Sequence, residues 1–230
     1  MRIAEIGHEG PLPTGFDRLA AEARACRICV EAPRGAPLPQ PPRPIIQGSA
    51  TARILIAGQA PGTRVEASGI PFDDRSGDRL RDWMGVAPAV FYDRAQIAIL
   101  PMGFCFPGLD AKGSDRPPRR ECAPRWRQDF IDAMPAVRLV LAIGGAAQRW
   151  HLGLDAADGV DATVRRWRDI LDRPAEPKVI PLPHPSWRNT GWLTRNPWFE
   201  QDLLPVLRRL IDDQLSRLDN EAAMIENKIL

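Results

Sequence analysis

Four short apolar runs in this 230-residue chain have the length and composition of buried strands. They cover residues 53–57, 97–100, 138–143 and 178–182. Before, between and after them, apolar residues recur every three or four positions, which is the spacing of an amphipathic helix. These helical patterns cover residues 16–26, 79–84, 121–133, 146–152, 164–171 and 198–218.

Strands that alternate with helices predict a parallel sheet with helices on both faces. We therefore expect an α/β fold, a three-layer α/β/α sandwich with a central four-stranded parallel sheet. Residues 31–44 contain six prolines and are predicted to form an irregular extended loop. We expect residues 1–218 to form one domain. Residues 219–230 show no clear docking pattern and are predicted to be a C-terminal tail that frays.

Composition narrows the class of protein only slightly. The hydrophobic content of 44% and the charged content of 26% are ordinary for a soluble globular protein. The net charge of +2 is too small to indicate nucleic-acid binding by itself. The sequence contains no run of 18 apolar residues, which a membrane-spanning helix would need, and its first residues lack the apolar core of a signal peptide. We expect no membrane association and a cytoplasmic location, where thiols stay reduced.

Two polar motifs follow predicted strands. Gly58-Gln59-Ala60-Pro61-Gly62 follows the first strand, and His184-Pro185-Ser186-Trp187-Arg188-Asn189 follows the last. Open α/β sheets bind ligands beyond the carboxyl ends of their strands. Glycines in the first motif permit a close approach of the backbone to a ligand, although a turn without a ligand has the same pattern.

His184 lies between two prolines, which restrict the backbone and hold the direction of the imidazole. A histidine held in this way is a good hydrogen-bond donor to a developing anion. Ser186, Arg188 and Asn189 add donors that suit phosphate oxygens.

A third segment, Gly69-Ile70-Pro71-Phe72, ends in an aromatic residue and is followed by Asp73 and Asp74. The ring of Phe72 could stack on a planar ligand or anchor the core. The two carboxylates could take part in acid–base chemistry, or could cap a helix that begins near Ser76.

Four cysteines have a spacing that suggests a metal site: Cys26, Cys29, Cys105 and Cys122. The first two form a Cys-x2-Cys pair, and the last two flank a loop rich in proline and glycine. Four thiolates can hold zinc or a 4Fe–4S cluster, and spacing alone favours zinc, the commoner structural metal. The alternative is an incidental pair and two buried free thiols.

Together these residues resemble the uracil-DNA glycosylase superfamily, over about residues 26–210. The first motif is similar to the Gly-Glu-Ala-Pro-Gly of the iron–sulfur (family 4) enzymes, and Gly69-Ile70-Pro71-Phe72 is similar to their Gly-x-Pro-Phe. Their cluster ligands follow the same order with similar gaps, so the resemblance implies 4Fe–4S instead of zinc. The second motif is closer to the His-Pro-Ser-Pro-Arg-Asn of the single-strand-selective monofunctional glycosylases.

The resemblance implies a monofunctional hydrolase of base excision repair, which removes uracil or a related damaged base from DNA and leaves an abasic site. Phe72 would stack on the base, and His184 would donate a hydrogen bond to uracil O2. The implied base pocket consists of Gly58, Gln59, Ala60, Pro61, Gly62, Phe72, His184 and Asn189. The implied DNA contacts are Arg64, Pro185, Ser186 and Arg188.

The sequence departs from the family pattern at the residues that would position the attacking water. Ala60 stands where the most efficient family has an aspartate, and Gln59 stands where family 4 has a glutamate. Residues 98–103 also lack the asparagine with which the relatives read uracil. We expect Asp73 or Asp74 to position the water. The catalytic set is therefore Gln59, His184, Asp73 and Asp74.

These departures leave two alternatives to a glycosylase. One is a protein that binds damaged or abasic DNA with weak or lost turnover. The other is an enzyme that uses the same fold on nucleotides or other small molecules. Release of a free base from an oligonucleotide distinguishes a glycosylase from both alternatives.

Overall fold

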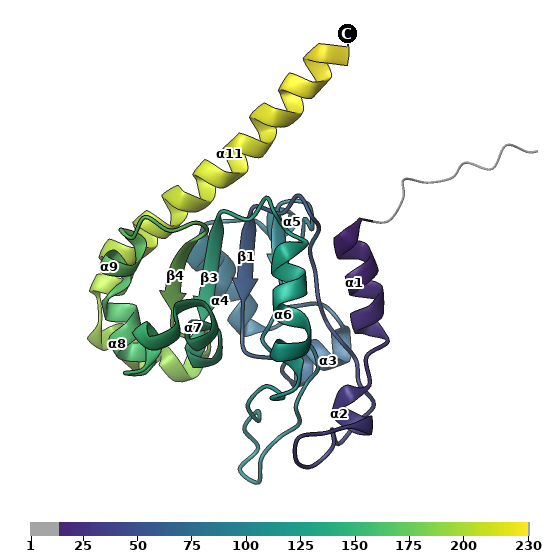
Figure 1. Ribbon diagram of the computed structural model, residues 1–230. Helices are drawn as coiled ribbons and strands as arrows, with labels where there is room; N and C mark the ends of the chain where they lie inside the picture. Colours follow the sequence, from purple (N-terminus) through teal and green to yellow (C-terminus); the bar gives the residue numbers. More distant parts are fainter. Residues whose placement is uncertain (1–13, 230) are drawn as a thin grey trace, which may run out of the picture.

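A computed structural model describes residues 14–229, and for Leu154 and residues 217–229 it describes the backbone alone (Figure 1). Its centre is one sheet with the order β2-β1-β3-β4, in which every neighbouring pair is parallel. The strands are β1 (Ile54–Ala57), β2 (Ile97–Ile99), β3 (Leu139–Ile143) and β4 (Lys178–Leu182). The four predicted strands are confirmed, with ends shifted by no more than one residue.

Helices cover both faces of the sheet because successive strand residues point to opposite sides. Ile54 and Ile56 of β1 face a core shared with α4 (Arg75–Met84), α9 (Trp167–Leu171) and α11 (Leu204–Ile229). Leu55 and Ala57 face a second core with α1 (Gly15–Arg24) and α6 (Cys122–Asp132). The strands are buried on both sides, and the predicted three-layer α/β/α sandwich is confirmed.

The remaining helices are short. They are α2 (Ile28–Glu31), α3 (Thr63–Ser68), α5 (Pro88–Phe91), α7 (Gly144–Leu152), α8 (Val160–Arg165) and α10 (Thr190–Arg195). Two 3-10 turns cover Gly153–Ala156 and Trp187–Asn189. The single helix expected over 164–171 is divided into α8 and α9 at Arg166, where ψ is 18°. Apolar spacing did not reveal the break, because Val164 and Trp167 are buried in the same core.

The C-terminal helix follows a π-helical turn, Phe199–Leu203. Pro205, in the first turn of α11, lacks the N–H that would donate to the carbonyl of residue 201, and a wider turn precedes it. Residues 219–229 continue α11, which runs away from the sheet in Figure 1. The domain boundary at 218 and the fraying of the tail stay predictions, and residues 1–13 lie outside the described residues.

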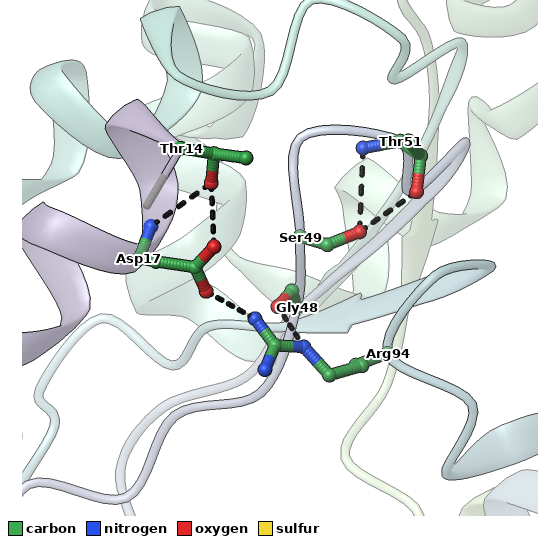
Figure 2. Close-up of polar contacts among 6 residues, drawn as sticks. All are labelled: Thr14, Asp17, Gly48, Ser49, Thr51 and Arg94. Carbon is green, nitrogen blue, oxygen red and sulfur yellow. Dashed lines mark hydrogen bonds and ion pairs between the residues drawn. The ribbon is translucent and has the colours of Figure 1, made fainter. Parts of the chain in front are cut away.

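The start of α1 is tied to the sheet by a small polar network (Figure 2). Thr14 caps α1 by accepting a hydrogen bond from the backbone N–H of Asp17 at 3.2 Å. Arg94 pairs with Asp17 at 2.5 Å and donates to the carbonyl of Gly48 at 3.0 Å. These contacts orient α1, whose far end leads to Cys26. No helix within residues 14–229 is long and apolar enough to cross a membrane.

Candidate active site

A cavity of about 550 Å³ lies at the carboxyl ends of the strands. Both motifs line it, although they lie far apart in the sequence. The lining includes Gly58, Gln59, Ala60, Pro61, Gly62, Arg64, Phe72, Asp74, Asp115, His184, Ser186 and Arg188. The volume is in the range that holds a small planar ligand.

The first motif forms the connection from β1 to α3. Its backbone is held by the neighbouring segment, because the N–H groups of Met102 and Gly103 donate to the carbonyls of Gly58 and Gln59, both at 2.9 Å. The side-chain amide of Gln59 donates to the carbonyl of Arg116 at 3.4 Å. A Cβ at Gly58 would lie 3.5 Å from the ring of Phe72, so this ring lies against the motif.

Phe72 has a left-handed backbone, with φ of +54°, which is unusual for an aromatic residue. Its carbonyl accepts a hydrogen bond from the Tyr92 hydroxyl at 3.4 Å and lies directly against Gly77 of α4. Its ring meets that of Phe91 edge to face at 6.2 Å. The surrounding core therefore determines where the ring stands in the wall of the cavity.

His184 follows β4 and is half-buried in the cavity wall. Burial lowers the pKa of His184, while the charges of Asp74 and Asp115 act in the opposite direction. The imidazole is therefore neutral at neutral pH, with one N–H to donate. The amide of Asn189 donates to the carbonyl of His184 at 2.7 Å. Asn189 is not in the cavity lining, so its amide serves the backbone of His184.

The two carboxylates expected near the water have different positions. Asp74 lines the cavity and caps α4, where Oδ1 accepts a hydrogen bond from the N–H of Gly77 at 2.9 Å. Asp73 does not line the cavity. Their predicted role in positioning water stays a prediction.

Asp115 is a cavity residue that the sequence motifs did not reveal. It belongs to a hairpin-like loop between Cys105 and Cys122, where Leu109 and Asp115 form an antiparallel bridge. Oδ2 of Asp115 lies 3.3 Å from the position that a Cβ would take at Gly62. Burial raises the pKa of Asp115, while the charges of His184 and Arg188 lower it.

Four arginines line the cavity: Arg64, Arg75, Arg116 and Arg188. Arg188 donates to the hydroxyl of Ser114 at 3.3 Å, and its guanidinium lies 5.8 Å from the ring of Trp187. The side chain of Trp187 is 71% exposed. Pro185 is buried and does not line the cavity, whereas Ser186 does. Arg79 of α4 donates to the carbonyl of Ser186 at 2.9 Å and so anchors this loop.

The sequence model of the uracil DNA glycosylase superfamily matches residues 45–208, which is well over half of the chain. The chain belongs to the uracil DNA glycosylase superfamily. The matched range begins before β1 and contains both motifs and the cavity between them.

Among solved structures, the chain is similar to the crystal structure of wild-type SMUG2 from Pedobacter heparinus, at 15% sequence identity and a TM-score of 0.34. The similarity covers 75% of this chain and 77% of that one.

The four cysteines of the chain, Cys26, Cys29, Cys105 and Cys122, line a second, small cavity. None of them forms a disulfide. The backbone N–H of Phe104 donates to Sγ of Cys122 at 3.3 Å, which is a contact suited to a thiolate. Burial raises the pKa of Cys29 and Cys105 and raises that of Cys122 to about 12, so all three are thiols when nothing is bound.

The donor set fits an iron–sulfur cluster in its chemistry, because four thiols and no other ligand type surround the cavity. Within residues 14–229, no group of three or more His, Cys, Asp or Glu side chains is arranged to hold a metal ion. The donor set thus fits a cluster by its chemistry alone.

Proposed function

We propose that the protein is a monofunctional DNA glycosylase that removes uracil or a related deaminated base and leaves an abasic site. The observation that carries the proposal is the shared cavity. An aromatic ring, a neutral histidine and four arginines line this space of about 550 Å³.

The base would reach this cavity only after it leaves the stack. The Phe72 ring would then lie against one face of the base, while Gly58 leaves the space beside the ring open. The hydrogen-bond and ring contacts of Phe72 hold it in place before the base enters, so little ordering is needed at binding.

His184 would stabilise the leaving base. As the N-glycosidic bond lengthens, negative charge builds on the base and its O2 accepts a stronger hydrogen bond from the imidazole N–H. One donor of this kind contributes about 3 kcal/mol to the barrier. Asn189, through its bond to the His184 carbonyl, would keep the imidazole in position.

The cavity rim would hold the DNA strand. Arg64 and Arg188 provide charge for phosphates, and Ser186 provides a hydroxyl. The exposed ring of Trp187 lies beside Arg188 and could stack on a base next to the flipped one. The near-neutral net charge does not argue against this, because four arginines line the cavity itself.

We also propose that Cys26, Cys29, Cys105 and Cys122 hold a 4Fe–4S cluster. Such a cluster would tie the segment after α1 to both ends of the loop that carries Asp115. Purified protein should be brown, with broad absorption near about 400 nm and about four irons per chain. A colourless protein that contains one zinc would contradict the cluster.

The experiment that tests the function uses one uracil-containing oligonucleotide, single- and double-stranded, with alkali to cleave abasic sites. Wild type should yield cleaved product, and His184→Ala should reduce the single-turnover rate by about 100-fold, which corresponds to about 3 kcal/mol. Thermal unfolding should be similar for the two proteins, since His184 is only half-buried.

Binding without product is the outcome that favours the second candidate. Gln59 and Ala60 contribute no carboxylate from the first motif, and this observation is what favours a protein that binds damaged DNA without turnover. A salt-dependent shift of the same oligonucleotide, with no release of any deaminated base, would contradict the glycosylase.

A further inference from the structure

The cavity contains two carboxylates, and only one of them is free of a structural task. Asp74 accepts a hydrogen bond from the N–H of Gly77 and caps α4. The Asp115 carboxylate accepts no hydrogen bond from the described residues, and its residue is exposed to the cavity. Its oxygens are therefore available to a water molecule or to a ligand.

Asp115 faces the segment that lacks a carboxylate of its own. Its Oδ2 lies 3.3 Å from where a Cβ would stand at Gly62, the residue that precedes α3. Gln59 and Ala60, at the turn after β1, are neutral. A carboxylate beside Gly62 thus comes from a loop that lies more than 50 residues further along the chain.

The neighbours of Asp115 hold it in position. Arg116 accepts a hydrogen bond from the amide of Gln59 at 3.4 Å, and Ser114 accepts one from Arg188 at 3.3 Å. Each bond ties the loop to one of the two motifs. The residue between these two contacts is therefore held over the cavity.

The loop has its own internal order. The N–H of Arg116 donates to the carbonyl of Gly108 at 2.9 Å, and the N–H of Asp110 donates to the carbonyl of Ser114 at 2.8 Å. The carboxylate of Asp110 accepts from the N–H of Lys112 and from that of Ser114, at 2.8 and 2.9 Å. This order supports the placement of Asp115 before any substrate binds.

We propose that Asp115 is the catalytic residue that orients the attacking water and accepts its proton. The proposal rests on the glycosylase function proposed above. In the step, the water oxygen forms a bond to C1′ while the bond from C1′ to the base nitrogen breaks. The electron pair of that bond stays on the base, and the water proton moves to Asp115. The base anion takes a proton from solvent, and Asp115 returns its proton to solvent.

The electrostatic surroundings suit this role. The charged and titratable groups that face Asp115 are His184, Asp74 and Arg188, and Arg116 follows it in the chain. Burial and Asp74 raise the pKa of Asp115, which makes the carboxylate a stronger base, while His184 and Arg188 favour its ionised form. An anion here would also stabilise the positive charge that develops on the sugar.

The test compares wild type with Asp115→Asn and Asp115→Glu in single-turnover excision of uracil from an oligonucleotide. Asp115→Asn keeps the shape and removes the base, so the rate should fall by about 10²–10⁴-fold. Affinity for the same oligonucleotide should change by less than about threefold. Asp115→Glu retains a carboxylate and should recover part of the rate.

The pH profile separates a base from a structural role. Wild-type excision should decline as the pH falls through the raised pKa of Asp115, and this acid limb should be absent in Asp115→Asn. A limb that persists in that variant would belong to another group and would overturn the base role of Asp115.

A further control variant is Lys112→Ala, which removes an exposed side chain of the same loop that does not line the cavity. If wild type excises uracil and Asp115→Asn does so at nearly the same rate, the role of Asp115 is overturned and the glycosylase function stands. An equal loss in Lys112→Ala and Asp115→Asn would show that loop structure is responsible, which also overturns the role of Asp115. Wild type that releases no base would contradict both proposals.

Discussion

Gly77→Ala should reduce the excision rate by displacing Phe72, although Gly77 itself lies outside the cavity. Gly77 is the third residue of α4 and does not line the cavity. A Cβ at this position would lie 1.8 Å from the carbonyl oxygen of Phe72 and 2.9 Å from its Cβ. Both neighbours belong to the segment that holds the aromatic wall, and the nearest is backbone, which cannot rotate away.

The required movement can be read from these distances. Ordinary contact begins at 3.4 Å, so the Phe72 carbonyl has to move by about 1.6 Å relative to α4. Misplacement of a reacting group by about 1 Å can cost about 100-fold in rate. We expect a loss of about 100-fold in the single-turnover rate. Alanine adds up to about 1 kcal/mol of helix propensity, which offsets part of the cost of overpacking, about 1–3 kcal/mol.

The assay is single-turnover excision of uracil together with thermal unfolding. Gly15→Ala is the matched control, because Gly15 begins α1 and a Cβ there meets nothing within 4 Å. It should excise at the wild-type rate. Excision by Gly77→Ala within about threefold of the wild-type rate would contradict the claim that the position of Phe72 determines the rate.

Two further predictions concern charge. Arg188→Ala should weaken binding to uracil-free single-stranded DNA and reduce the slope of log affinity against log salt by about one. The control variant is Arg18→Ala, at an exposed position on α1, and its slope should equal that of wild type. An unchanged slope for Arg188→Ala would show that Arg188 does not contact phosphate. Burial and the charge of Arg127 lower the pKa of His151 to about 3, from an ordinary 6.5. Between these values the unfolded chain binds the proton and the folded chain does not, so stability should fall on acidification below pH 6.5, by up to about 1.4 kcal/mol per pH unit. Urea unfolding at several pH values should show a shallower pH dependence of stability in His151→Gln, and identical pH dependence in the two proteins would contradict a neutral His151.

The sequence predicted the sheet well because its strands are buried on both faces. The runs at 54–57 and 139–143 are continuously apolar, and such runs between turn residues are recognisable without any tertiary information. The short helices α2, α3, α5 and α10 were not predicted, since four to six residues are too few to show a helical period. The break between α8 and α9 was hidden because both halves face one core.

The candidate site was predictable where residues of one motif act together, and less so where the fold brings separate segments to one place. Phe72 and His184 line the cavity as expected. Asp115 lies in a loop of prolines and charged residues with no local signal, and only the fold, which brings it beside Gly62 and within the field of Arg188, reveals its position. Asn189 has donors that suit a ligand, but its amide donates to the backbone of its own loop.

The most direct test of the account is mass spectrometry of a uracil-containing oligonucleotide after incubation with the wild-type protein. Wild type should release free uracil and leave an abasic oligonucleotide in equal amounts, without cleavage of the strand. An intact oligonucleotide that remains bound, with no free base from uracil or from any other deaminated base, would contradict it.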